Sequence, residues 1–434
     1  MRVVIVGAGL GGLACAIACR REELEVVVLE RADEIASIGA GIQVPPNGTR
    51  VARQLGYLDK LLQCGVALEA LELRRYANGK TLYRRTIKDR DARYGDFWIV
   101  IHRADYHDVL WRTCKELGVD LRLNKEVKSI DFEKNTVMLE DGDVVGADVL
   151  IGADGLYSTC RDVLLGSPSS LVETGELAYR STLALDSLKA LNDPLVDELC
   201  IRKQVTIWLG PGKHAVFYPV RGGQEFNLVL SSPDDLGHGM RRVDGKIEEM
   251  RENYKGWDET LTRLIHLIPT IQKWKLYIHP ELETWTKGCF ALLGDACHPT
   301  LPYQAQGAAM AVEDGAVLGK LLGSLKASTG DDMKQLIPEI LKLYESLRKP
   351  RTTTNVTGAK TNQKWYQVPD GPEQEARDAE LAGVELSQGL APTGWRWLRG
   401  DYQAELLGRD SVAEAVEAFK GWKQKKEAGL VDAA

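Results

Sequence analysis

Three glycines near the N-terminus have a spacing with a chemical meaning. Gly7, Gly9 and Gly12 form the pattern G-x-G-x-x-G around Ala8, which permits a tight turn, close approach of backbone N–H groups to a pyrophosphate, and packing of a helix on a strand. Glu30 follows at roughly the 20-residue distance at which a carboxylate accepts hydrogen bonds from adenosine ribose hydroxyls. The spacing predicts a dinucleotide site. It leaves FAD and NAD open, because both contain an ADP half.

Two further groups with cofactor chemistry lie almost three hundred positions later. Asp295 ends an apolar run, where its carboxylate can accept from ribityl hydroxyls or, alternatively, cap the following helix. Gln306, Gly307 and Ala308 open an alanine-rich segment, so free N–H groups at that helix start can stabilise negative charge on a ring system. An ordinary small-residue helix start is the alternative.

His214 and Tyr218 form a third candidate pair, because alternate side chains of a strand share one face. The imidazole and the phenol therefore project together. The alternative is a strand face on which both side chains are packed and hydrogen-bonded. Gly41, in a glycine-rich stretch, can bring backbone close to a bound ring or simply belong to a loop.

The elements that position these groups follow from the apolar patterning. Residues 3–6 and 26–29 are β-branched runs typical of buried parallel strands, and residues 13–21 favour a helix, so the chain begins with a βαβ unit. Alternation from about 171 to 278 predicts a largely antiparallel sheet. A buried strand is expected at 290–295 and a helix at 308–325, in the same strand-then-helix pattern as the N-terminal βαβ unit.

We therefore expect an α/β protein with a Rossmann-like cofactor domain of residues 1–170 and 285–350, in which an excursion at about 70–100 contributes to the substrate region. Residues 171–284 are expected to form a β-sheet substrate domain, and residues 351–434 a helical C-terminal tail.

The composition and net charge of the chain limit the classes of partner that we expect it to bind. The chain has 434 residues and a net charge of −7, which gives no global attraction for nucleic acid and favours a small-molecule partner. Eight cysteines without C-x-x-C or zinc spacing predict free thiols and no metal site, which is typical of a cytoplasmic protein. Glycines interrupt the apolar run at residues 3–19, so no membrane span is expected.

Three separated segments together resemble the single-component, FAD-dependent aromatic hydroxylases of the salicylate and p-hydroxybenzoate hydroxylase group. These segments are the glycine motif with Glu30-Arg31, then Gly152-Ala153-Asp154-Gly155-x-x-Ser158-x-x-Arg161, then Gly294-Asp295-Ala296-x-His298-x-x-x-Pro302-x-x-x-Gln306-Gly307, followed by Glu313-Asp314. The resemblance covers roughly residues 1–350. It implies FAD as cofactor and a p-hydroxybenzoate hydroxylase-like fold with an inserted, mostly antiparallel substrate domain.

The resemblance also implies roles for single residues. Arg31 belongs to the first motif, Asp154 to a motif that touches both flavin and nicotinamide, and Arg103 matches a position that contacts FAD. An arginine at position 103 can neutralise a pyrophosphate, whereas the alternative is a solvated helix start. Gly41 is expected beside the flavin ring.

Four residues are implied to be catalytic. Arg180 resembles an active-site arginine that holds a phenolate, although a surface arginine is the alternative. Arg84 and Arg85 are the other candidates for holding a substrate carboxylate. His214 and Tyr218 are candidates for hydrogen-bonding or deprotonating the substrate hydroxyl. Pro302 is expected above the flavin.

The implied reaction is NADH- or NADPH-driven hydroxylation of a salicylate-like phenolic substrate with O2, through a C4a-hydroperoxyflavin. One alternative is a tailoring monooxygenase that hydroxylates, epoxidises or dearomatises a larger secondary metabolite. A second is a non-catalytic flavin-fold binding protein. The sequence is compatible with a monomer or a homodimer.

Overall fold

The β-branched runs of the N-terminal half become parallel strands in the computed structural model, which describes residues 1–35, 39–87, 94–328, 333–383 and 394–429. A six-stranded sheet has the order β19-β20-β12-β1-β2-β8. Its strands are β1 (Arg2–Val6), β2 (Glu25–Leu29), β8 (Asp120–Arg122), β12 (Val149–Gly152), β19 (Thr286–Lys287) and β20 (Phe290–Leu292). Only β19 runs antiparallel to its neighbour. Strands β1 and β2, from the first thirty residues, therefore lie in the same sheet as β19 and β20, from residues 286–292.

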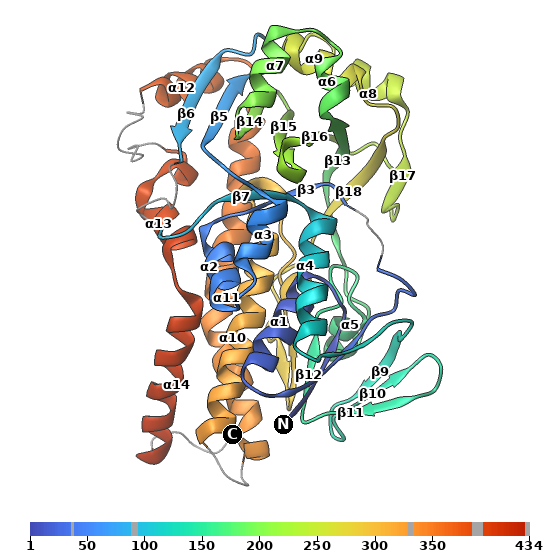
Figure 1. Cartoon of the computed structure of the whole chain (residues 1–434), viewed down its shortest axis with the longest axis vertical. Coiled ribbons are helices and arrows are strands. Elements are labelled where there is room, and N and C mark those ends of the chain that lie inside the picture. The colour runs from blue at the N-terminus through green and yellow to red at the C-terminus, as the bar shows by residue number, and fades with distance from the viewer. Residues whose placement is uncertain (36–38, 88–93, 329–332, 384–393, 430–434) are drawn as a thin grey trace.

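Helices α1 (Leu10–Arg21) and α10 (Gly307–Ser328) pack closely against each other in the lower half of the molecule (Figure 1). Small residues permit this approach. A Cβ atom at Gly315 would lie 2.6 Å from the backbone nitrogen of Cys15, and one at Gly319 would lie 2.5 Å from the Cβ of Ala18. The pairing of the helices holds their N-terminal ends in the same region. Helices α4 (Arg103–Glu116) and α5 (Thr159–Leu165) complete this half.

The second sheet has eight strands in the order β17-β18-β13-β16-β15-β14-β5-β6 and occupies the upper half of the molecule (Figure 1). Its strands are β5 (Ala70–Arg75), β6 (Thr81–Thr86), β13 (Val172–Ala184), β14 (Gln204–Gly210), β15 (Lys213–Val220), β16 (Glu225–Pro233), β17 (Arg242–Asp244) and β18 (Gln272–Ile278). All pairings are antiparallel except that of β14 with β5. The hairpin β5–β6, which comes from the N-terminal part of the chain, extends this sheet.

Short elements fill the remaining faces. Helices α6 (Leu185–Lys189), α7 (Pro194–Ile201), α8 (Ile247–Asn253) and α9 (Glu259–His266) lie on the eight-stranded sheet. A three-stranded sheet of β3 (Gly41–Val44), β7 (Ile99–His102) and β4 (Val66–Ala67) lies between the halves. Helices α2 (Pro46–Gln54) and α3 (Leu58–Cys64) connect β3 to β4 in the chain. Strands β9 (Val127–Asp131), β10 (Thr136–Leu139) and β11 (Val144–Gly146) form a separate antiparallel sheet.

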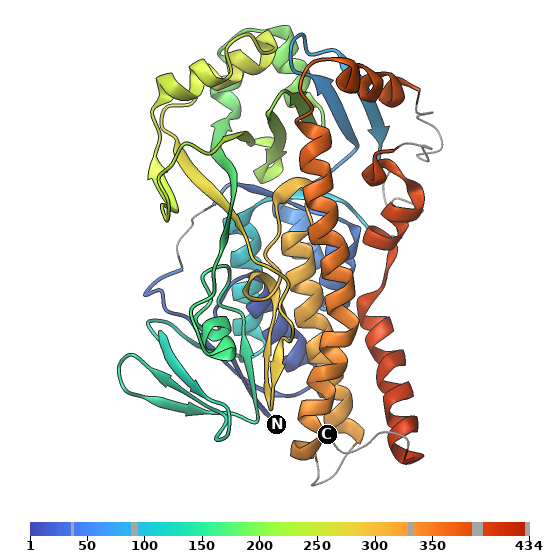
Figure 2. The same ribbon diagram turned by 180° about the vertical axis from the view of Figure 1, so that it is seen from behind.

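The C-terminal region is helical and spans both halves. Helix α11 (Met333–Tyr366) runs along the back of the molecule from one half to the other (Figure 2). The domain boundary expected at residue 350 therefore falls inside a continuous helix, which includes Pro338 and Pro350. Helices α12 (Pro372–Ala382), α13 (Gly400–Gly408) and α14 (Ser411–Glu427) follow.

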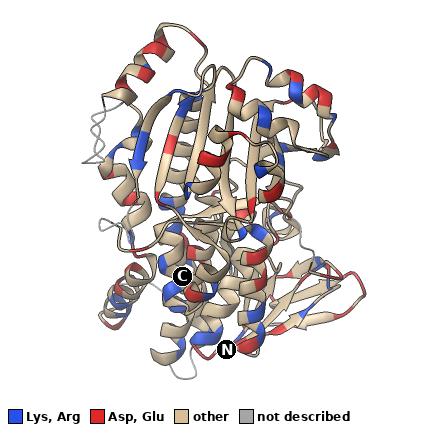
Figure 3. Cartoon of the chain, turned by 45° about the horizontal axis from the view of Figure 1, so that its top comes forward, with Lys and Arg blue, Asp and Glu red and all other residues tan. Residues whose placement is uncertain are grey.

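The predicted fold class is confirmed by these sheets. Basic and acidic residues are intermixed along the elements in view (Figure 3). Within the described ranges, no helix is both long enough and apolar enough to cross a membrane.

Candidate active site

A cavity of about 380 Å³ lies where the two sheets approach each other. One end is lined by the start of α1, the loop after β20 and the start of α10, and the other end by β13, β15 and β16. Eleven of the residues expected at the site line it, counting the three residues of the last segment separately. They are Gly9, Gly41, Arg103, Arg180, His214, Tyr218, Asp295, Pro302 and the Gln306-Gly307-Ala308 segment.

The glycine turn leaves an open, donor-rich surface at the first end. Gly7 has φ of +105°, and a Cβ atom there would lie 2.5 Å from the carbonyl oxygen of Ala153. A Cβ at Gly9 would meet nothing within 4 Å. Helix α1 begins there without a side-chain cap, so its first N–H groups are available to an anion. Gly12 packs instead against Gly7.

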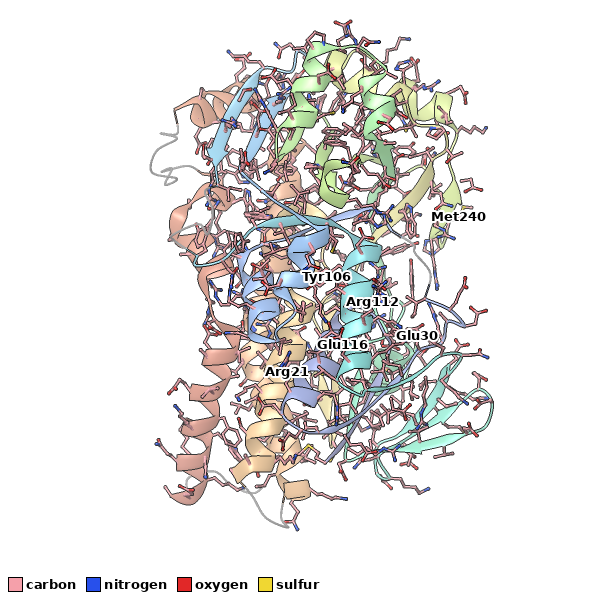
Figure 4. The ribbon with its side chains drawn as sticks, in the orientation of Figure 1. Arg21, Glu30, Tyr106, Arg112, Glu116 and Met240 are labelled. Carbon is pink, nitrogen blue, oxygen red and sulfur yellow. The ribbon has the colours of Figure 1, made fainter. Side chains whose placement is uncertain are left out.

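Glu30 closes this turn from the end of β2. Its carboxylate accepts from the backbone N–H of Ala8 at 2.8 Å and from that of Ala32 at 2.9 Å. Figure 4 labels Glu30 beside α4, in the half that carries the six-stranded sheet. Arg31 is exposed and lies outside the cavity lining.

Asp295 lies just past β20, at the carboxyl end of a parallel strand. Its side chain is open to the cavity, but protein surrounds the carboxyl group, and this burial raises its pKa despite the opposing charges of His298 and Arg103. Helix α10 begins close by, and Gln306 is held by Asn47, whose Nδ2 donates to Gln306 Oε1 at 3.0 Å. A carboxylate and a helix N-terminus therefore face the same space.

A buried charge network lies behind this loop, and sequence reasoning missed it. Asp314 accepts from His298 Nε2 at 2.5 Å and from Arg348 Nε at 2.7 Å, while Glu313 accepts from Arg348 at 2.8 Å and from Arg351 at 2.8 Å. Asp314 also accepts from the backbone N–H of Gly294 at 3.0 Å. Apolar periodicity gave no sign of this network, although the Glu313-Asp314 pair inside an apolar helix was an available signal.

Asp154 has a local role. Its carboxylate accepts from the hydroxyl of Ser158, the N-cap of α5, and from the backbone N–H of Cys160 in the first turn of that helix, and it does not line the cavity. The same motif reaches the Asp295 loop through Arg161, whose Nη1 donates to the carbonyl of Ala296 at 3.1 Å. The second and third motifs are therefore joined by a buried arginine.

Arg180 and Tyr218 meet at the other end of the cavity. Arg180 is half-buried and has no ion-pair or hydrogen-bond partner among the described residues. Burial lowers the pKa of Arg180, and the nearby charge of Arg103 lowers it further. Burial raises the pKa of Tyr218 far above its usual range, with the Arg180 charge opposing this shift. At neutral pH this end of the cavity thus offers a cation and a neutral phenol.

His214 lies beside them on β15. It is 5% exposed, its Nδ1 lies 2.6 Å from the hydroxyl of Ser231, and its ring contacts those of Tyr303 and Tyr366. Burial lowers the pKa of His214 to about 3, so the imidazole is neutral at physiological pH.

Gly41 and Pro302 define the walls between the two ends. A Cβ atom at Gly41 would lie 2.6 Å from the Tyr218 ring and 2.7 Å from the Cβ of Asn227, and the Gly41 N–H donates to Asn227 at 2.7 Å. Pro302 begins a short 3-10 helix, Pro302–Gln304, that ends at Ala305 with φ of +56°. A β-carbon at position 41 would therefore require the Tyr218 and Asn227 side chains to move.

Comparison with known proteins identifies this architecture. Residues 1–359 match the family model described as an FAD binding domain. The chain belongs to this family. It is 39% identical over 426 residues to the FAD-dependent monooxygenase OpS4 of Beauveria bassiana (strain ARSEF 2860), covering 95% of this chain and 97% of the relative. It is 33% identical over 413 residues to 3-hydroxybenzoate 6-hydroxylase 1 of Aquipseudomonas alcaligenes, covering 93% and 98%.

Solved structures agree on the fold. The salicylate hydroxylase substrate complex superposes with a TM-score of 0.78 at 23% identity, covering 96% of this chain and 98% of the other. Klebsiella pneumoniae HpxO complexed with FAD and uric acid gives a TM-score of 0.76 at 26% identity, covering 94% and 97%. The predicted p-hydroxybenzoate hydroxylase-like fold and the family resemblance are confirmed.

The residues present fit FAD, the cofactor of this FAD-dependent monooxygenase of the aromatic hydroxylase type. Gly9 leaves space in front of uncapped N–H groups, Glu30 stands beside that turn, and Asp295 and the start of α10 face the same cavity. Among the described residues, no group of three His, Cys, Asp or Glu side chains is placed to hold a metal.

Proposed function

We propose that this protein uses NADH or NADPH and O2 to hydroxylate a small phenolic aromatic compound of the hydroxybenzoate or salicylate class. The observation that carries the proposal is the Arg180 guanidinium, which faces the cavity without a carboxylate partner in the described part of the chain. Withdrawing a cation from water, even in part, is costly unless an anion pairs with it. A phenolate or a benzoate carboxylate supplies that anion.

The polar and apolar walls suit an aromatic ring with one ionised oxygen. Arg180, His214 and Tyr218 gather on one side, and Ile42, Val216, Val229 and Leu293 supply apolar surface. Bound FAD supplies the electrons and the activation of O2. The residues of this chain hold the ring, orient its oxygen and keep water away from the reacting carbon.

The Gly9, Asp295 and α10 end is proposed to hold the dinucleotide and isoalloxazine parts, with Arg103 near the junction of the two ends. Arg103 lies within electrostatic reach of both Asp295 and Arg180. Pro302 and Ala305 line the cavity between Asp295 and α10, so we assign them to the wall that faces the flavin.

The test is a substrate screen with the FAD-loaded enzyme. NADH and NADPH oxidation is followed with salicylate, 3-hydroxybenzoate and simple phenols, and oxygenated products are separated by chromatography. Substrate-stimulated oxidation with a hydroxylated product is expected. Absence of any oxygenated product across the panel would refute the proposal.

A second candidate, oxygenation of a larger secondary metabolite, is favoured by a neighbouring cavity of about 960 Å³ that shares Arg103 and Arg180 with the first. A ring bound at Arg180 has room to continue into it. Thr270 lines only this second cavity, so Thr270→Trp is expected to spare turnover of hydroxybenzoates and to block turnover of an extended substrate. Equal turnover of both by the variant argues against the extended substrate.

A further inference from the structure

The hydrogen-bond partners of His214 indicate which of its ring nitrogens carries the proton. Ser231, on β16, is buried, and its hydroxyl oxygen lies 2.6 Å from His214 Nδ1. The same oxygen accepts from the backbone N–H of His214 at 3.1 Å. Among the described residues, the only acceptor within reach of the Ser231 hydroxyl proton is His214 Nδ1.

The Gln367 side-chain amide places a second donor near the Ser231 hydroxyl. An ionised Glu176 can only accept hydrogen bonds, so the Gln367 side-chain atom that faces it is the donor Nε2. This contact fixes the orientation of the Gln367 amide. That Nε2 also lies 3.0 Å from the Tyr303 hydroxyl and 3.3 Å from the Ser231 hydroxyl. Tyr303 in turn donates to Glu176 at 2.6 Å. The Ser231 oxygen therefore faces donors in the His214 backbone N–H and the Gln367 amide, and His214 Nδ1 is the acceptor open to its own proton.

It follows that Nδ1 of a neutral His214 is an acceptor, and Nε2 carries the hydrogen. Nε2 has no protein partner in the described chain, and it is absent from the buried polar atoms that lack one. It is therefore open to the cavity that His214 lines. A buried imidazole thus presents an N–H group to whatever binds beside Arg180.

We infer that Ser231 is a positioning residue that holds His214 as the Nε2–H tautomer, so that His214 donates a hydrogen bond to the substrate oxygen and is not the base that deprotonates it. This inference rests on the proposed function for the identity of the ligand. The substrate hydroxyl loses its proton to water, and the site binds the phenolate oxygen between His214 and Arg180.

The surroundings of His214 support this assignment. The groups that face it are Tyr303, Tyr366, the Tyr254 hydroxyl on its carbonyl, Ser231, and, across the cavity, Arg180 and Tyr218. Glu176 lies one hydrogen bond further away, behind Tyr303 and Gln367. No carboxylate in the described chain contacts the imidazole, so nothing there stabilises the charged form that a base must adopt.

The first experiment reads the tautomer without any substrate. Histidine labelled with 15N is observed in the FAD-loaded enzyme by two-bond proton–nitrogen correlation, and the His214→Gln variant identifies the signal among the seven histidines. We expect a protonated Nε2 and a bare Nδ1, unchanged between about pH 6 and 8. A proton on Nδ1, or a charged ring in that range, would overturn the inference.

Two serine variants separate the hydroxyl from the fold. Ser231→Ala removes the proton given to Nδ1 and is expected to give a mixture of tautomers, while Ser231→Thr retains a hydroxyl and the wild-type signal. Identical spectra for Ser231→Ala and the wild type would show that Ser231 does not set the tautomer. Because no substrate is present, this result is independent of the screen for hydroxylation.

A pair of histidine variants tests the donor role with the substrate found in that screen. The amide nitrogen of His214→Gln reaches the place of Nε2, whereas that of His214→Asn reaches only the place of Nδ1. We expect His214→Gln to keep substrate KM within about threefold and His214→Asn to raise it about tenfold or more. Equal loss of kcat in both variants with unchanged KM would identify His214 as a base.

Discussion

Arg348 is the centre of the buried charge network. Its replacement tests whether this network stabilises the cofactor half, the half of the molecule that contains the six-stranded sheet and the glycine turn. Arg348 is 1% exposed and bridges Asp314 at 2.7 Å and Glu313 at 2.8 Å. Arg348→Met keeps the approximate volume and removes the charge. Glu313 retains its ion pair with Arg351 and Asp314 retains its contact with His298, so each carboxylate loses Arg348 and keeps one other ionisable side chain.

Removing one partner of a buried ion pair costs about 3–5 kcal/mol, because the remaining charge has already lost its hydration. The remaining partners place Arg348→Met near the lower end, about 3 kcal/mol. The free energy of unfolding of a globular protein is about 5–15 kcal/mol, so the loss expected for Arg348→Met is a large fraction of it. The loss also reaches the site, because Asp314 holds the N–H of Gly294, the residue before Asp295. Weaker FAD binding is expected as well.

The assay is guanidinium unfolding followed by tryptophan fluorescence, with and without FAD, together with titration of FAD into the apoprotein. Arg112→Met is the matched control. Arg112 is 71% exposed on α4 and pairs with Asp108 one turn earlier (Figure 4), so a change within about 0.5 kcal/mol is expected. If Arg348→Met and Arg112→Met unfold at the same midpoint, the network contributes no net stability and the reasoning is wrong.

Three further outcomes are expected. Asp295→Ala removes a carboxylate acceptor from the cavity and should weaken FAD affinity about tenfold to a hundredfold, the cost of a hydrogen bond to a charged group; unchanged affinity by fluorescence titration would separate Asp295 from the cofactor. Arg180→Met should raise substrate KM at least about tenfold, with FAD affinity unchanged, and a variant with wild-type KM would remove Arg180 from substrate binding. Burial alone raises the pKa values of Glu313 and Asp314, but the surrounding Arg351, Arg348 and His298 charges reverse this and lower both to about 2; stability from these carboxylates is therefore present above their ordinary values near 4 and is lost as pH falls toward 2. A flat unfolding midpoint across that range would contradict this.

The C-terminal region shows where local patterning stops being informative. Its helical character was predicted, but not its contact with the site. Tyr402 of α13 accepts from Gln304 at 3.0 Å, and Arg351 donates to the carbonyls of Glu405 and Leu406 at 2.8 Å. These contacts link the Pro302–Gln304 segment and the charge network to helix α13. Gln304 and Tyr402 are 98 positions apart in the sequence, and Arg351 is more than fifty positions from Glu405 and Leu406. Sequence periodicity reports which face of a helix is apolar, not which distant surface covers it.

The sequence by itself determined the cofactor half. The G-x-G-x-x-G turn, Glu30 and Asp295 after a buried strand have fixed backbone geometries, because a glycine at positive φ and the end of a parallel strand dictate where N–H and carboxylate groups point. Only the tertiary structure decided the other half. It brought Arg180 beside Tyr218, set Asn227 against Gly41, and placed Ser231 where it orients His214. Those relations depend on strand register and on packing between segments distant in the chain, and neither is encoded in a local pattern.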